Sequence, residues 1–150
     1  MILIKNSQRT YTVDKKSTTN MVQKLLDSLG YGTFDIGIWF TNNKTIALYN
    51  KEYRRKEGPT DILSFPYHTK LNAGQKIVPH GVDEANLGDI IISLEYVYTS
   101  ERWQDTPESE RLPILLVHGI CHLLGYDHEN DKDYQVMHKK ELELLKIIKK

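Results

Sequence analysis

The segment Val117 to Glu129, VHGICHLLGYDHE, constrains this chain more than any other part of it. It places His118, His122 and His128 in the pattern H-x-x-x-H-x-x-x-x-x-H. Side chains four residues apart on a helix lie about 5–6 Å apart on one face, so His118 and His122 can address the same ion. Gly125 then ends the helix, because glycine adopts a positive φ at little cost, and the returning chain brings His128 to that ion as a third ligand.

Three neutral imidazoles are typical zinc ligands, with zinc–nitrogen distances of about 2.0–2.1 Å, and they leave a fourth position open. An open position on zinc holds a water molecule and lowers its pKa towards 7, which is typical of a catalytic site. The alternative is that these histidines bind no metal. Their mostly aliphatic neighbours argue against it, since imidazoles in such surroundings need a metal or carboxylates as partners. The pattern therefore predicts one zinc ion per chain.

Hydrophobic periodicity around this segment predicts an α+β fold in which a central helix carries the metal ligands. The run Ile114 to Leu124 is apolar nearly all round, although Pro113 just before it can kink or split the helix. Strands and helices alternate in the first half and helices dominate the second, which favours a small mixed four-stranded sheet with the C-terminal helices on one face. The predicted strands are Ile2–Ile4, Phe34–Phe40, Asp61–Pro66 and Leu87–Ser93, and four of the predicted helices are Thr18–Leu29, Leu94–Trp103, Pro107–Leu124 and Asp131–Ile148. A further helix, capped by Asn42 or Asn43, is predicted to end near the charged stretch Arg54 to Glu57.

The last predicted helix is amphipathic, with lysines on its outer side. We expect His138 at a helix interface, because it has helical spacing with apolar neighbours. The residues predicted to face inward are Tyr134, Met137, His138, Leu142, Leu145 and Ile148.

Two other histidines, His68 and His80, flank the segment from Leu71 to Asn86. This segment contains glycine and proline and has no sustained period, so we expect a long loop and expect both histidines in solvent. Cys121 lies on the metal-binding helix but points away from His118 and His122, which predicts a core position.

The length of 150 residues fits a single domain, 1–150. Lys plus Arg equals Asp plus Glu, at 20 each, so net charge gives no argument for a nucleic-acid or membrane partner. The longest aliphatic runs have four residues, as in Ile114–Val117, against about 20 for a membrane span, so we expect no membrane partner. A single cysteine and an N-terminus without a secretion signal predict a cytoplasmic protein.

The histidine string is similar to the metzincin pattern H-E-x-x-H-x-x-G-x-x-H, which implies a zincin-like arrangement. The glutamate that acts there as general base is Gly119 in this chain. That difference argues against a protease of the metzincin type.

The full string HGICHLLGYDH resembles the YbeY family of metal-dependent endoribonucleases. Two further signatures support the resemblance: Tyr53-Arg54 followed by PTDILSFP at 59–66, and LGDI at 87–90. Together the three cover the chain from about residue 49 to 130 in the family's order. The first 45 residues match only in their coarse β-α-β order, and the small departures at Arg55 and Cys121 leave the three histidines untouched.

The resemblance implies a single-strand-specific endoribonuclease with zinc held by the three histidines. It further implies action in ribosomal RNA processing, including maturation of the 3′ end of 16S rRNA, and in ribosome quality control, with the ribosome or its small subunit as partner. Cleavage of a phosphodiester also needs a cation beside the phosphate oxygens. The Tyr53-Arg54 signature favours Arg54, whose planar guanidinium matches two of those oxygens.

We therefore predict Arg54 and His118 as catalytic residues, and Arg54, Arg55 and Lys56 as substrate contacts. Between Lys44 and Glu57 five basic residues stand against two acidic ones, which is consistent with an RNA-facing surface. The alternatives are a zinc-dependent peptidase-like hydrolase and a ribosome assembly factor with structural zinc. Asp127 either orients a histidine or caps the turn, and the sequence leaves the oligomeric state open.

Overall fold

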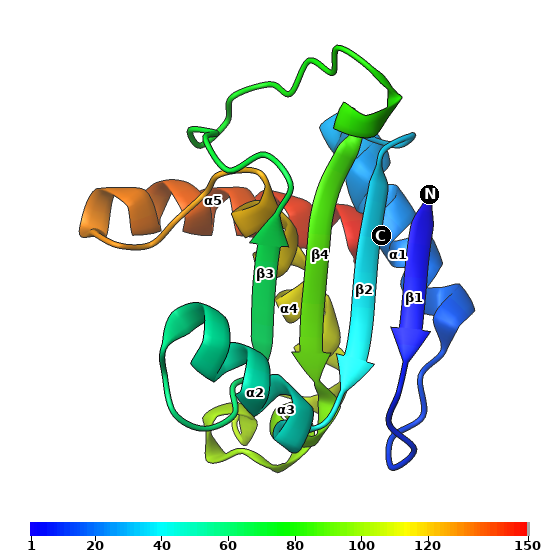
Figure 1. Ribbon diagram of the computed structural model, residues 1–150, viewed down its shortest axis with the longest axis vertical. Helices are drawn as coiled ribbons and strands as arrows, with labels where there is room; N and C mark the ends of the chain where they lie inside the picture. The colour runs from blue at the N-terminus through cyan, green and yellow to red at the C-terminus, as the bar shows by residue number, and fades with distance from the viewer. Residues whose placement is uncertain (150) are drawn as a thin grey trace.

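The computed structural model describes residues 1–149, so the last residue of the predicted domain, 150, lies outside the described residues. The elements follow the predicted order, and all four predicted strands are present (Figure 1). They are β1 (Ile2–Asn6), α1 (Lys15–Leu29), β2 (Asp35–Thr41), α2 (Asn43–Arg54), β3 (Ile62–Pro66), η1 (Val82–Glu84), β4 (Asn86–Ser93), α3 (Leu94–Thr99), η2 (Glu101–Trp103), α4 (Glu108–Leu123) and α5 (Asp131–Ile148).

The strands form one four-stranded sheet in the order β1-β2-β4-β3. β1 and β4 both run parallel to β2, whereas β3 runs antiparallel to β4. The sheet is therefore mixed, as the sequence predicts. The predicted long loop joins β3 to β4 and contains only the short helix η1.

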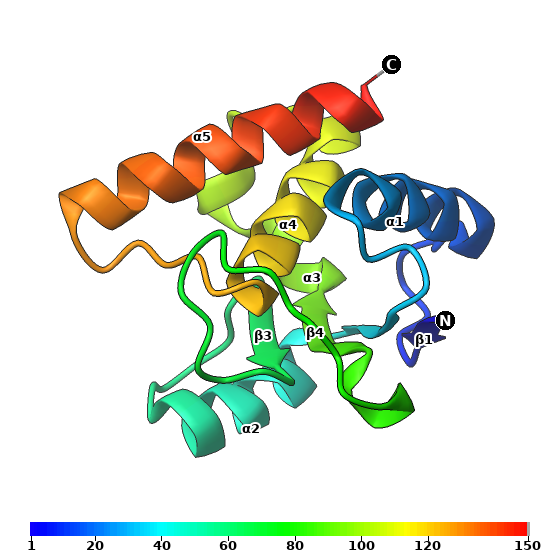
Figure 2. The ribbon, with the colours of Figure 1, turned by 90° about the horizontal axis from the view of Figure 1, so that it is seen from above.

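Helices cover the two faces of the sheet unequally (Figure 2). Side chains alternate across a strand, so Ile36, Ile38 and Phe40 of β2 point to the face that carries the main core, together with α1, α4 and α5. On the opposite face, α2 packs Ile46 against Leu63 and Ile91 in a smaller cluster.

The central helix α4 is continuous from Glu108 to Leu123 although Pro113 lies inside it. The backbone bond that Pro113 cannot donate would go to the carbonyl of Ser109, which is exposed and can bond to water. Cys121 is fully buried in the core, as predicted. Within residues 1–149, no helix has both the length and the apolar character needed to cross a bilayer.

The prediction of a single helix over Leu94–Trp103 is wrong, because the helix is interrupted at Ser100. The backbone there is extended, with φ −76° and ψ 140°, which separates α3 from η2. The Ser100 hydroxyl then accepts a hydrogen bond from the Arg102 backbone N–H, so it caps the second segment.

The predicted inward face of α5 is also partly wrong. Tyr134 and Leu142 are 54% and 48% exposed, and His138 is exposed too, so it does not lie at a helix interface. The buried residues are Met137 and Leu144, which are seven positions apart on one stripe. The stripe is narrow because α5 crosses α4 and α1, and its N-terminal half extends past β3 (Figure 1).

α4 lies close against the sheet at Gly119. A Cβ on this residue would lie 2.8 Å from Cδ1 of Ile90 and 2.9 Å from Cδ1 of Ile62. Gly119 is therefore required by packing at the position where the metzincin pattern has its glutamate.

We expect Gly119→Glu to destabilise the fold by more than about 3 kcal/mol, because it forces a carboxylate into an apolar contact that has no room or partner for it. Chemical denaturation measures the loss. Gly81→Glu is the matched control, since a Cβ there meets nothing within 4 Å. Equal denaturation midpoints for the two variants would contradict this account of Gly119.

Candidate metal centre and cleft

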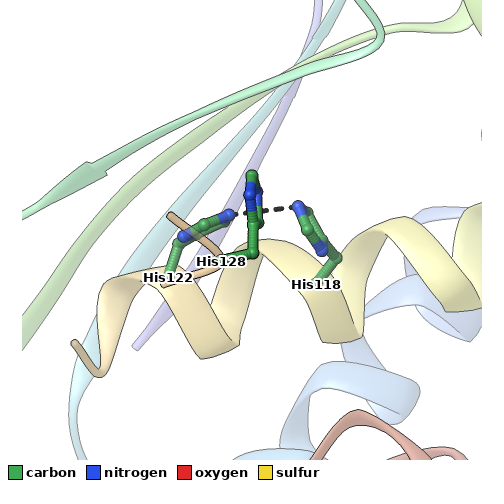
Figure 3. A group of neighbouring side chains, drawn as sticks. All are labelled: His118, His122 and His128. Atoms are coloured by element: carbon green, nitrogen blue, oxygen red, sulfur yellow. Dashed lines mark hydrogen bonds between the residues drawn. The ribbon is translucent and has the colours of Figure 1, made fainter. Parts of the chain in front are cut away.

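His118 and His122 project from the last turns of α4, and His128 lies in the connection from α4 to α5. The three rings converge (Figure 3), and one ligand atom from each lies within 4.8 Å of the others. The Nε2 atoms of His118 and His122 are 3.1 Å apart. Two nitrogens bound at about 2.1 Å to one tetrahedral ion would be roughly 3.4 Å apart, so this pair is already close to ligand geometry.

Gly125 makes the turn that brings His128 back. Its φ is +91°, as the sequence predicts, and its N–H donates to the carbonyl of His122 at 3.1 Å. A Cβ on Gly125 would also lie 2.7 Å from the Leu71 carbonyl oxygen, so the β3–β4 loop packs directly on the turn. Both the backbone conformation and this contact require glycine here.

Hydrogen bonds on the far side of two rings determine where their protons lie. The Nδ1 of His122 is 3.0 Å from the Tyr126 carbonyl oxygen, which can only accept, so this nitrogen carries the proton. The Nδ1 of His118 lies 2.8 Å from the Glu141 carboxylate, an acceptor as well. In the neutral rings each Nε2 then has a free lone pair, and the two lone pairs face each other.

The pKa of His122 supports the neutral form. Burial, followed by the nearby rings of His118 and His128, lowers it to about 4, against smaller opposite effects from the Tyr126 carbonyl and Asp127. His122 is therefore uncharged at neutral pH. Two converging lone pairs with no proton between them suit a cation, so the His118, His122 and His128 group could bind a metal ion.

Glu141 is a functional candidate that the sequence reasoning missed. It lies on α5, 23 residues from the histidine it contacts, and carboxylate partners of this kind orient metal-binding histidines in many proteins. The sequence could have indicated Glu141 by its position on the buried face of α5, between Met137 and Leu144, because a carboxylate on such a face needs a partner.

Asp127 caps the turn. Its Oδ1 accepts a hydrogen bond from the backbone N–H of His128 at 2.7 Å, which holds the chain where the third ring approaches the other two. His68 is half-buried rather than solvated, because its Nε2 bonds to the Glu84 carbonyl at 2.8 Å, whereas His80 is exposed as predicted.

The three histidines open into a cleft of about 690 Å³ that also reaches β3 and η2. Arg54, the last residue of α2, lines this cleft. Arg55 and Lys56 do not line it. Arg55 instead ends α2 in the left-handed conformation, with φ +56°, and its N–H bonds back to Lys51.

A second guanidinium, that of Arg102, lines the same cleft. Its Nε is 3.4 Å from the Asp61 carboxylate, which is buried and also accepts a hydrogen bond from the Trp103 indole at 3.1 Å. The Arg102 side chain is nevertheless 64% exposed, so it remains accessible to a ligand. The sequence carries no signal for it, since Arg102 stands alone among acidic residues.

We expect Glu141→Gln to weaken metal binding about 10- to 100-fold, because the amide no longer holds the His118 ring as a charged acceptor does. Competition with a chromogenic chelator measures the affinity. Glu143→Gln is the matched control on the same helix, since that carboxylate is exposed and pairs with Lys140. Equal affinities in the two variants would show that Glu141 does not orient the site.

Comparisons with known proteins show which family the chain resembles. The family model described as Endoribonuclease YbeY matches residues 3–149. The chain is 35% identical to the human protein named Endoribonuclease YbeY over 144 residues, covering 96% of this chain and 86% of that protein. It is 36% identical to the protein of the same name from Persephonella marina over 149 residues, covering 99% of this chain and 92% of that one.

The solution structure of TM1509 from Thermotoga maritima shares the fold. It superposes with a TM-score of 0.62 at 24% identity, covering 99% of this chain and 89% of that one. Family model, relatives and fold cover nearly the whole chain, and the three histidines with their Gly125 turn lie inside the matched region. The chain belongs to the YbeY family of endoribonucleases.

Proposed function

We propose that this protein is a zinc-dependent endoribonuclease that cleaves single-stranded RNA, with His118, His122 and His128 as the zinc ligands. The observation that carries the proposal is the pair of Nε2 lone pairs facing each other at 3.1 Å inside the cleft that also contains Arg54. A bound zinc ion supplies a Lewis acid and lowers the pKa of water towards neutrality.

The residues of the chain perform the other tasks. Arg54 and Arg102 bind the oxygens of the scissile phosphate, because each guanidinium offers two parallel donors and stays charged at any working pH. Glu141 keeps the proton of His118 on Nδ1, so that its Nε2 points into the cleft. The catalytic role of His118 is that of a zinc ligand, and Glu141 outside the cleft orients its ring.

A peptidase-like hydrolase is disfavoured, since Gly119 supplies no general base and the sheet leaves no space for one. A purely structural zinc site is disfavoured as well. Structural sites are closed by four protein ligands, whereas these three histidines line an open cleft and His128 is exposed.

The wider role follows from the family. We propose ribosomal RNA processing, including the 3′ end of 16S rRNA, ribosome quality control, and the ribosome or its small subunit as partner. We also propose a zincin-like arrangement of the metal helix, one domain over residues 1–150, and a cytoplasmic location. Arg55 and Lys56, beyond the cleft at the end of α2, stay predicted contacts for more distant phosphates.

We expect the purified protein to contain one zinc per chain and to cleave single-stranded RNA, and we expect His122→Ala to lose both properties while staying folded. Elemental analysis, an RNA cleavage assay before and after chelation, and circular dichroism measure these quantities. His80→Ala is the matched control, because that ring is exposed and outside the group. Full cleavage by metal-free protein, or cleavage of a peptide instead of RNA, would refute the proposal.

We expect Arg54→Lys to reduce the cleavage rate at least about tenfold without changing zinc content or melting temperature, since lysine keeps the charge but loses the planar fork. Arg54→Glu should be slower still, because it opposes the phosphate charge. Single-turnover cleavage measures the chemical step. If Arg54→Ala cleaves RNA at the parental rate, the catalytic role of Arg54 is wrong and Arg102 alone binds the scissile phosphate.

A further inference from the structure

β3 is an edge strand of the sheet, and its outer side carries main-chain groups that no other strand uses. The strand order is β1-β2-β4-β3, so β3 pairs with β4 alone, and no further strand lies beyond it in Figure 1. Edge strands present unpaired N–H and carbonyl groups to which another chain can bond. The outer side of β3 is therefore a candidate binding surface.

The pairing with β4 determines which residues of β3 point outward. The Asp61 carbonyl, just before the strand, accepts a hydrogen bond from the Ser93 N–H of β4 at 2.9 Å. Residues of an antiparallel strand alternate between bonding to the partner strand and pointing away from it, and the register runs without a bulge to Pro66. The main-chain groups of Ile62, Ser64 and Pro66 therefore point away from β4.

These outward groups include a donor beside an acceptor. Ile62 and Ser64 each present an N–H and a carbonyl, whereas Pro66 presents only a carbonyl because proline has no N–H. Within residues 1–149, no other group forms a hydrogen bond with these outward atoms. The Ile62 carbonyl and the Ser64 N–H are neighbours along the edge, so one ligand can bond to both.

The cleft with the three histidines runs along this outer side. Every residue from 60 to 66 lines it. Side chains of a strand alternate between the two faces of the sheet, with Ile62 toward α4 and Leu63 toward α2, so one cleft contacts all of them only at the edge of the strand. His118 and Arg54 line the same cleft. The unpaired main chain of β3 is therefore one wall of the candidate active site.

We propose that the outer edge of β3 binds the Watson–Crick edge of an unpaired base in the RNA that enters the cleft, an inference that rests on the proposed function. The Ile62 carbonyl accepts one hydrogen bond from the base, and the Ser64 N–H donates another to it. Proteins that bind single-stranded RNA commonly bond to this edge of its bases.

All four bases can make this pair of hydrogen bonds. Each has a donor beside an acceptor on its Watson–Crick edge: N6–H and N1 of adenine, N4–H and N3 of cytosine, N1–H and O6 of guanine, and N3–H and O4 of uracil. The edge of β3 therefore binds a base without selecting among the four.

The same contact excludes double-stranded RNA. In a duplex, the donor and the acceptor of each Watson–Crick edge are already bonded to the opposite strand, so neither is free for Ile62 or Ser64. Selection of single strands thus follows from the main chain of β3.

A peptide strand is the other ligand that an edge strand can bind, by extending the sheet. Pro66 ends the run of donors after Ser64, which leaves a short ladder for such a strand. Arg54 lines the same cleft and forms no ion pair within residues 1–149. A peptide main chain offers this guanidinium no anion, whereas RNA carries a phosphate next to every base. The cleft therefore favours RNA.

The test compares oligouridines that are unmodified, methylated at N3 of every base, or methylated at C5 of every base. The N3 methyl group replaces the donor of the Watson–Crick edge, and the C5 methyl group adds the same bulk on another edge. Fluorescence anisotropy measures affinity for the protein in chelator, so that no metal-dependent cleavage runs. We expect the N3-methylated oligomer to bind about tenfold more weakly than the other two, which should bind alike.

A variant locates the effect on β3. Ser64→Pro removes the outward N–H, and an edge strand tolerates proline where that N–H faces away from the ladder. We expect Ser64→Pro to bind all three oligomers about as weakly as the parent binds the N3-methylated one. Ser64→Ala is the matched control, because it keeps the N–H and should behave as the parent does. Circular dichroism checks the fold, and if Ser64→Pro unfolds, the comparison of the three oligomers on the parent decides alone.

Equal affinities of the parent for the N3-methylated and C5-methylated oligomers would overturn the proposal, and they are the result expected if the edge receives a peptide strand instead. A folded Ser64→Pro that still distinguishes the two oligomers would overturn it as well. Metal-dependent cleavage that proceeds equally on both methylated oligomers would refute the edge contact alone. A binding preference without any cleavage of RNA would refute the proposed function alone.

Discussion

The contact of α4 with the sheet at Gly119 is the constraint on which the rest of the site depends. Because this residue has no side chain, the helix lies directly on Ile62 of β3 and Ile90 of β4. His118 and His122, which precede and follow Gly119 on α4, line the cleft together with residues of β3. Arg54, which lines the same cleft, belongs to α2 on the other side of the sheet.

Hydrogen bonds from outside the cleft orient two of the three histidine rings. Glu141 on α5 and the Tyr126 carbonyl in the Gly125 turn each accept a hydrogen bond from the Nδ1–H of one ring, so both Nε2 lone pairs point into the cleft. Burial lowers the pKa of His122 and keeps that ring neutral. The ability of this site to bind a cation therefore depends on the polar groups outside the cleft as well as on the histidines themselves.

Edge strand β3 separates two surfaces of different chemistry. On one side lie the histidines and two guanidinium groups, and on the other lie aromatic rings and the Asp89 carboxylate. The end of α2 joins the two surfaces because consecutive residues, Tyr53 and Arg54, face different sides.

The sequence by itself determined the features that depend on local spacing. The four-residue interval of His118 and His122, the positive φ of Gly125 and the alternation in β2 are set by neighbours within a few bonds, and all could be predicted. Only the tertiary structure decided which face of α5 is buried, that Glu141 meets His118, that Arg102 joins the cleft, and that α2 covers only part of one sheet face. These features arise from packing between residues distant in the chain, where the crossing of helices, rather than periodicity, selects the contacts.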